Sequence, residues 1–96
     1  MSTTVDERQA AQRRVADLIE LARSLAPAQH AMQIVQEAEA LNRAIAAFHL
    51  EAIRFRMYNV DRLVTHSPIL LPVEAAQAVA DARHHLEAAG FHTRSH

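Results

Sequence analysis

The chain has 96 residues, a formal net charge of −1, no cysteine, one glycine and three prolines. Half of the residues are hydrophobic, but only 4% are aromatic. The lack of cysteine excludes disulfides, thiolate catalysis and cysteine-based zinc sites, and a single glycine excludes a glycine-rich phosphate loop. We expect one all-helical domain over residues 1–96, because this composition suits helices that pack closely through small side chains.

The first predicted helix runs from about residue 5 to residue 26. Its apolar residues follow the 4-3-4-3 spacing of a helix that packs along an antiparallel neighbour. They are Ala11, Val15, Leu18, Ala22 and Leu25, with Ile19 and Leu21 widening the stripe. Pro27 ends this helix or kinks it, and a short connection then reverses the chain.

The second predicted helix runs from about residue 28 to residue 65. At 1.5 Å per residue it would be about 55 Å long, so the first helix could cover little more than half of it. Its apolar side chains form two stripes whose centres lie about 130° apart. The first stripe is Ile34, Ala38, Leu41, Ile45, Phe48, Ala52 and Phe55, and the second stripe is Ala46, Leu50, Ile53, Met57, Val60 and Val64.

The third predicted helix runs from residue 72 to residue 89. Pro72 suits its first turn, and Gly90 supplies a left-handed stop. Its apolar stripe buries little area because it is mostly alanine: Ala75 or Ala76, Val79, Ala82 and Leu86. Residues 66–71 form an extended apolar linker, whose residues 69–71 are expected to plug the end of the bundle. The tail, residues 91–96, is expected to fray.

Two apolar stripes on the second helix predict self-association. The third helix offers mainly alanine and the first is too short, so neither covers both stripes. We therefore expect a three-helix antiparallel bundle with a long central helix, assembled as a homodimer or tetramer. The predicted oligomer interface is the second stripe, from Ala46 to Val64.

A polar row lies between the two stripes at seven-residue spacing: Asn42, His49 and Arg56. In a buried seam such residues fix the register of the partner helix. The alternative is a polar pocket in which His49 binds a metal or haem, or titrates, and Arg56 receives an anion. No acid shares the face of Arg56, so its partner is expected on another helix, with Asp17, Glu20 or the second subunit as candidates.

The side of the second helix away from the stripes is charged. It carries Arg43, Glu51, Arg54, Asp61 and Arg62. Tyr58 also lies on this side, and we expect Arg54 and Arg62 to stack on its ring.

The helix layout, with a short first, a very long second and a short third helix, resembles that of the small all-helical metal-sensing bacterial repressors. The resemblance covers about residues 9–89 and includes the apolar pattern of Ile34-Val35-Gln36-Glu37-Ala38-Glu39-Ala40-Leu41, continuing to Ala44-Ile45. The metal ligands of that family would fall near Ala31, Arg56 and Val60, which do not form a normal ligand set. The resemblance therefore implies a DNA-binding dimer without metal sensing, with Arg13, Arg14 and Arg23 contacting DNA.

The function expected first is that of a small non-enzymatic interaction protein: an adaptor, scaffold or regulatory subunit that acts as an oligomer. Its partner would be itself or another protein. No HExxH or GxSxG motif is present, and no acids pair on an apolar face. The seven histidines are interpreted as solvated surface residues, with no metal or cofactor expected.

Two alternative functions remain open, a bundle that binds a metal or cofactor through His49 and the repressor-like DNA-binding dimer. Binding of nucleic acid by bulk charge is disfavoured, because ten arginines are spread evenly among eleven acids. The N-terminus has no apolar targeting region and no apolar run is long enough to span a membrane, so we expect a cytoplasmic protein.

Overall fold

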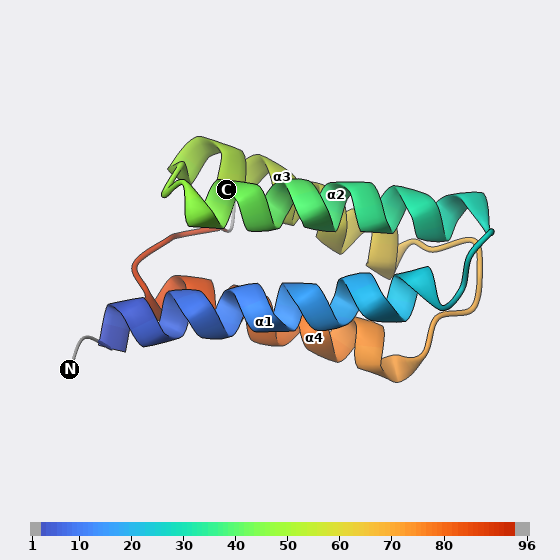
Figure 1. The fold of residues 1–96 in the computed structure, drawn as a ribbon, viewed down its shortest axis with the longest axis horizontal. Coiled ribbons are helices and arrows are strands. Elements are labelled where there is room, and N and C mark those ends of the chain that lie inside the picture. The colour runs from blue at the N-terminus through green and yellow to red at the C-terminus, as the bar shows by residue number, and fades with distance from the viewer. Residues whose placement is uncertain (1–2, 94–96) are drawn as a thin grey trace.

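The computed structural model describes the backbone of residues 3–93 and the side chains of residues 6–93, and it contains four helices (Figure 1). They are α1 (Thr3–Arg23), α2 (Gln29–Ala46), α3 (Leu50–Thr65) and α4 (Val73–Ala88). No strand occurs in the described part of the chain. The all-helical prediction is confirmed, but the three-helix prediction is wrong, because the expected long central helix is two helices, α2 and α3.

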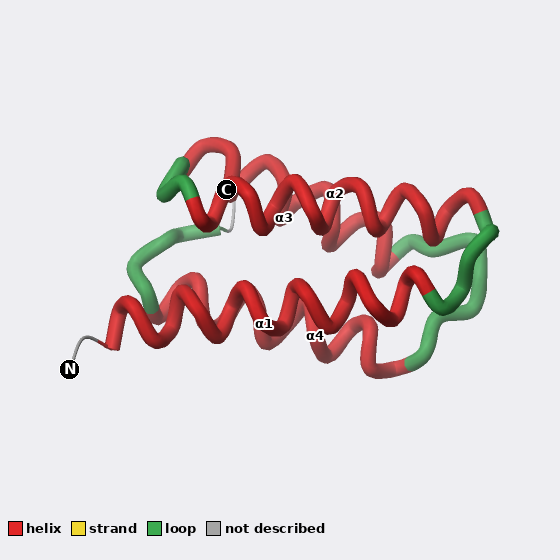
Figure 2. The backbone as a smooth tube through the Cα atoms, in the orientation of Figure 1, coloured by secondary structure: helices red, strands yellow, loops and turns green. Residues whose placement is uncertain are grey.

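The four helices run alternately up and down and form two layers, with α1 and α4 in one and α2 and α3 in the other (Figure 1). Helix α1 packs against both α2 and α4, whereas α3 packs mainly against α2 and only lightly against α4. The α1–α2 and α3–α4 connections lie at one end of the bundle, and the α2–α3 turn lies at the other (Figure 2). The molecule measures 40 × 27 × 20 Å.

The break between α2 and α3 is centred on Phe48. Its φ of +57° lies in the left-handed region, which normally favours glycine. The Phe48 N–H donates to the Ile45 carbonyl at 3.1 Å, and the His49 N–H donates to the Ala44 carbonyl at 3.1 Å. This pair of bonds is the Schellman motif that ends many helices. The His49 ring then caps α3, because its Nδ1 accepts the Ala52 N–H at 3.3 Å.

Phe48 is held in this conformation by segments from elsewhere in the chain. The guanidinium of Arg8, on α1, lies 4.1 Å from the centre of the Phe48 ring. The Phe91 ring, from the segment after α4, lies 6.1 Å away. Arg8 also donates from Nη1 to the Ile45 carbonyl at 3.4 Å. These contacts offset the cost of placing a bulky residue in the left-handed region.

The break determines which side of α3, the second half of the predicted long helix, is buried. Ile53, Met57 and Val60 are at most 1% exposed and belong to the core, whereas Phe55, which was expected to continue the first stripe, is 57% exposed. The largest fully buried side chains are Val15, Leu18, Ile34, Leu41, Ile45, Ile53, Met57, Val60 and Leu86. The chain therefore covers most of the predicted second stripe by itself.

The end of α4 matches its predicted stop, but the tail differs from expectation. Gly90 has φ +96°, and the Phe91 N–H donates to the Leu86 carbonyl at 2.8 Å. Phe91 then packs against the core, and the Arg54 Nε donates to the His92 carbonyl at 3.0 Å. Fraying is therefore wrong for residues 91–93, which these contacts hold across the bundle end, and residues 94–96 lie outside the described residues.

The linker between α3 and α4 closes the other end only in part. Leu71 packs against the core cluster and Ile69 is half-buried. Leu70 is 95% exposed, so the expected apolar plug does not include it. No helix within residues 3–93 has the length and apolarity that crossing a bilayer requires.

Candidate functional site

The aromatic side chains of this protein lie outside its core. The chain has three phenylalanines and one tyrosine, and none of the fully buried side chains of the described residues is aromatic. Phe48 and Phe55 are each 57% exposed, Tyr58 is 50% exposed, and Phe91 is half-buried. Since aromatic side chains carry more apolar area than most residues, their place on the surface requires an explanation.

Two of the four aromatic residues are explained by the fold. Phe48 and Phe91 contact each other at the α2–α3 turn, and Arg8 covers the Phe48 ring. The two rings that remain, Phe55 and Tyr58, contact arginines of their own helix. The Arg56 guanidinium lies 5.1 Å from the Phe55 ring centre, and the Arg62 guanidinium lies 5.7 Å from that of Tyr58.

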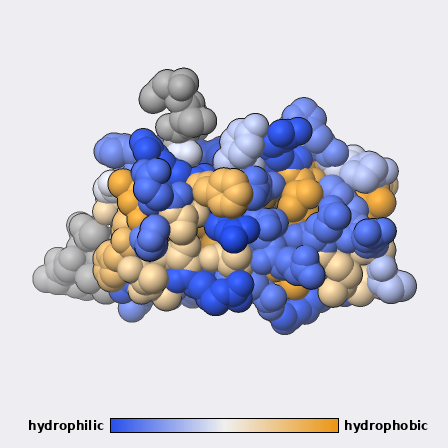
Figure 3. Space-filling model, turned by 90° about the horizontal axis from the view of Figure 1, so that it is seen from above, coloured by the Kyte–Doolittle hydropathy of each residue, from blue (hydrophilic) through white to orange (hydrophobic). Residues whose placement is uncertain are grey.

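Phe55 and Tyr58 belong to a stripe on the outward side of α3. Together with Glu51 and Arg62 they follow a 4-3-4 spacing, which places four side chains on one side of a helix. We call these four residues the α3 face. All four are exposed, and they lie opposite the core residues of α3. Viewed from the α2–α3 side, the molecule shows separate hydrophobic patches among hydrophilic side chains (Figure 3).

The charges at the two ends of the α3 face differ in sign. Glu51 makes a long ion pair with Arg54, at 3.4 Å, and its side chain is 79% exposed. Arg62 makes no ion pair with any residue between 3 and 93; its Nη1 donates to the Tyr58 hydroxyl at 3.4 Å. Solvated contacts of this kind contribute little to stability. The face therefore presents an available carboxylate at one end and an available guanidinium at the other.

A shallow depression of about 300 Å³ lies beside the α3 face. It is lined by Glu51, Arg54, Phe55, Tyr58 and Thr93. Three of these five residues belong to the face itself, so the face combines a ridge of aromatic rings with an adjoining hollow. Such relief can accept a side chain from another molecule.

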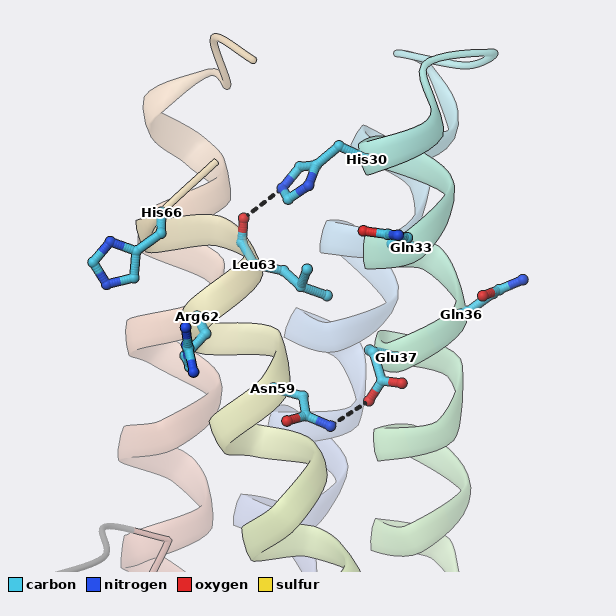
Figure 4. Close-up of a pocket in the computed structure, with 8 residues that line it drawn as sticks. All are labelled: His30, Gln33, Gln36, Glu37, Asn59, Arg62, Leu63 and His66. Atoms are coloured by element: carbon cyan, nitrogen blue, oxygen red, sulfur yellow. Dashed lines mark hydrogen bonds between the residues drawn. The ribbon is translucent and has the colours of Figure 1, made fainter. Parts of the chain in front are cut away.

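A second candidate is the cleft between α2 and α3, which has a volume of about 530 Å³ (Figure 4). It is lined by His30, Gln33, Gln36, Glu37, Asn59, Arg62, Leu63 and His66. In the close-up His66 points away from α2 and Gln36 points outward, so neither is aimed into the cleft (Figure 4).

Two polar contacts bridge this cleft. His30 Nε2 donates to the Leu63 carbonyl at 2.7 Å, and Asn59 Nδ2 donates to a Glu37 oxygen at 3.0 Å (Figure 4). Glu37 also accepts from Arg56 Nη1 at 3.0 and 3.1 Å. These bonds hold α2 against α3.

The three residues of the predicted polar row do not share one side of a helix, because the break lies between Asn42 and Arg56. Asn42 faces α1 and donates to the Gln12 carbonyl at 3.2 Å. His49 is an exposed helix cap, so it does not lie in a polar pocket within the bundle. Arg56 pairs at 3.0 Å with Glu37 of α2, instead of with Asp17, Glu20 or a second subunit. Glu37 lies in the stretch that was predicted to form one helix with Arg56, so the break brings this acid to Arg56. Each of the three residues has a role inside the chain.

The residues predicted as the oligomer interface divide into two groups. Ile53, Met57 and Val60 are in the core of the chain and Val64 packs against it. Ala46 and Leu50 are exposed at the end of the bundle near the α2–α3 turn. The stripe is therefore not a continuous surface that a second copy could contact.

The arginines expected to contact DNA are partly engaged with acids. Arg14 pairs with Asp17 at 2.8 Å and with Asp81 at 3.1 Å, and Arg23 pairs with Glu39 at 2.6 Å. Within residues 3–93, no group of three or more histidine, aspartate or glutamate side chains is placed to hold a metal ion. The described residues therefore form neither a cluster of metal ligands nor a group of unpaired arginines on α1 for DNA.

No protein-family model, curated protein or solved structure matches this chain. The resemblance to the metal-sensing repressors rested on a long second helix, and that helix is broken at Phe48. Arg62 lies beside the Tyr58 ring as expected. Arg54, which was also expected to stack there, bonds to Glu51 and to the His92 carbonyl, and Phe55 is exposed instead of lying in a buried stripe. The outward charges of Glu51 and Arg62 were a sequence signal for part of the α3 face. Phe55 could be assigned to this face only once the rotation of α3 about its own axis was known.

Proposed function

We propose that this chain is a non-enzymatic helical interaction protein, an adaptor, scaffold or regulatory subunit, which docks onto its partner through the α3 face. The observation that carries the proposal is the position of Phe55 and Tyr58. Both rings lie half-exposed on the outside of α3, and the guanidiniums that lie over them, those of Arg56 and Arg62, belong to the same helix.

The composition of the α3 face suits protein recognition. Tyrosine, phenylalanine and arginine are enriched at the centres of protein interfaces, whereas lysine is depleted there. Tyrosine and arginine are also frequent among the few residues that provide most of the binding energy. Arg54, Arg56 and Arg62 all lie on or beside this face. Self-association remains part of the proposal, and the α3 face replaces the second stripe as its interface.

The two alternative functions have lost the features on which they depended. A cofactor pocket required a buried His49, which is exposed and caps α3. A repressor-like dimer required a long central helix and free arginines on the first helix, and Arg14 is paired with two acids. The α2–α3 cleft is less suited to recognition than the α3 face, because His30, Glu37 and Asn59 in its lining are already bonded within the chain.

Photo-crosslinking in cells of the source organism tests the proposal. A photo-reactive phenylalanine analogue is introduced at position 55 in the full chain. We expect light-dependent formation of one or a few discrete protein adducts, because a docked partner would lie within contact distance of this ring.

The matched control carries the same analogue in place of Glu20, which is exposed on α1, the helix diagonal to α3. We expect no discrete adduct at that position. The proposal is wrong if position 55 also gives none, or if both positions give the same diffuse pattern of adducts.

A further inference from the structure

We propose that the partner of the α3 face is the α3 face of a second copy, packed antiparallel about a two-fold axis. This inference rests on the proposed function and names its partner. The observation that carries it is the order of the four side chains along α3, which makes the face complementary to itself.

The α3 face is symmetric in position and antisymmetric in charge. Its order is acid, aromatic, aromatic, arginine: Glu51, Phe55, Tyr58 and Arg62. Residues 51 and 62 are equally distant from the midpoint of the stripe, and so are residues 55 and 58. When a second α3 is laid antiparallel on the first about that midpoint, Glu51 of each copy lies opposite Arg62 of the other, and Phe55 lies opposite Tyr58. A two-fold contact of this kind uses the same patch on both copies.

This arrangement gives a closer, oppositely charged partner to two groups that make only long contacts in the single chain. Arg62, which makes no ion pair within residues 3–93, meets a carboxylate. Glu51, held only by a long contact with Arg54, meets a guanidinium. The two half-exposed rings are covered by rings of the second copy, in a pair that aromatic side chains favour.

The same charges exclude the other orientation. In a parallel pair, Glu51 would face Glu51 and Arg62 would face Arg62, and like charges opposed in this way disfavour the complex. The 4-3-4 spacing is that of the seam between paired helices. The face therefore specifies both the partner and its direction.

The contact is small, and this sets the conditions of the test. Sixteen residues of α3 span about 24 Å at 1.5 Å per residue. A single pair of such helices is at the low end of specific interfaces, so we expect a weak dimer that forms with rising concentration.

The test is sedimentation equilibrium of the purified full chain from about 10 μM to about 1 mM, a range that brackets weak association. Because the contact includes ion pairs, the buffer contains about 50 mM salt. The wild-type mass is expected to rise towards twice that of the chain. E51R and R62E should each weaken association by about tenfold or more, because every charged contact between two identical variants becomes repulsive.

Two rescues distinguish this contact from a general loss of fold. An equimolar mixture of E51R and R62E should associate, since both contacts in the mixed dimer are again between opposite charges. The double variant E51R/R62E should associate with itself for the same reason. E20R, on α1, is the control for charge alone and should sediment like the wild type. Circular dichroism checks that each variant is helical.

The inference is overturned if the wild-type chain keeps the mass of a single copy over the whole range, or if it associates and neither the mixture nor the double variant restores what the single variants lost. A chain that stays monomeric while position 55 crosslinks to a different protein leaves the proposed function standing and removes only the second copy. Absence of adducts at position 55 would remove the proposed function itself.

Discussion

The two aromatic pairs of this protein lie on the same small bundle but have different surroundings. Phe48 and Phe91 come from segments 43 residues apart, contact each other at 6.1 Å and share the bundle end with Arg8 of α1. Phe55 and Tyr58 come from one helix, and the guanidiniums beside them come from that helix too. Phe48 and Phe55, one from each pair, are equally exposed, at 57%.

This difference shows that exposure alone does not separate a structural aromatic residue from one available for binding. The first pair ties together α1, the α2–α3 turn and the segment after α4, so its removal should loosen the fold. The second pair lies beside arginines of its own helix and is at least half-exposed, so its removal should leave the fold intact and affect mainly association. The comparison therefore makes opposite predictions for stability and for binding.

The largest expected effect contrasts the two sides of α3. Ile53→Ala should lower the free energy of unfolding by about 2–5 kcal/mol, because Ile53 is fully buried and its truncation leaves a cavity. Phe55→Ala should change it by less than about 1 kcal/mol, because that side chain is 57% exposed. Urea denaturation at low micromolar concentration, where the chain is expected to be a monomer, measures both values.

The same two variants also test the break at Phe48. An unbroken helix from residue 28 to residue 65 would put Phe55 in the stripe that faces the first helix and Ile53 in an interface between copies. In the monomer, Phe55→Ala would then lower the free energy of unfolding more than Ile53→Ala. A Phe55→Ala variant less stable than Ile53→Ala would contradict the packing of α3 described above.

A smaller effect is expected at the turn itself. Phe48→Ile should destabilise the chain by about 1–2 kcal/mol, because a β-branched residue is strained at positive φ. Phe48→Gly should stay within about 1 kcal/mol of the wild type, since relief of the left-handed strain offsets the loss of ring contacts. Thermal and urea unfolding of the two variants compare them directly.

In a continuous helix this ranking would be the opposite. Glycine in a helix interior costs about 1 kcal/mol relative to alanine, whereas isoleucine costs less. A Phe48→Gly variant that is less stable than Phe48→Ile would therefore show that α2 continues into α3 in solution.

The ends of α1 and α4 could be predicted because ordinary signals mark them. Pro27 follows the first helix, Pro72 precedes the last, and Gly90 takes the left-handed conformation that ends it. The apolar stripes of these helices were also right for the residues that are buried, among them Val15, Leu18 and Leu86. In these parts of the chain, local preference and tertiary packing agree.

The turn between α2 and α3 could not be predicted in this way, because residues 46–50 contain neither glycine nor proline. Phe48 adopts a conformation that phenylalanine alone disfavours, and it does so through contacts with Arg8 and Phe91, which are distant in sequence. One trace of the turn was visible in the sequence. The two apolar stripes are out of phase by about 130°, as expected when a helix stops and a new one starts at another angle.

The α3 face was predictable only in part for the same reason. The outward positions of Glu51, Tyr58 and Arg62 followed from the polar side of the predicted helix. Phe55 was assigned to the first stripe, because that stripe was continued across a break that the pattern did not reveal. When α3 is treated as a separate helix, all four residues fall on one side of it. Their order along the helix is then acid, two aromatic rings and arginine.

The smallest expected effect is the coupling energy between an arginine and the aromatic ring beside it, compared for Arg8–Phe48 and Arg62–Tyr58. A double-mutant cycle with Arg8→Ala and Phe48→Ala should give a coupling of about 0.5–1 kcal/mol, because this guanidinium lies 4.1 Å from the ring and is half-buried. The cycle with Arg62→Ala and Tyr58→Ala should give less than about 0.5 kcal/mol in the monomer, since both side chains are exposed and the separation is 5.7 Å. If the second coupling equalled the first, Tyr58 would have a structural role like that of Phe48, and the distinction between the two aromatic pairs would fail. If it rose only at concentrations where the chain associates, Arg62 would be ordered by the partner and not by its own helix.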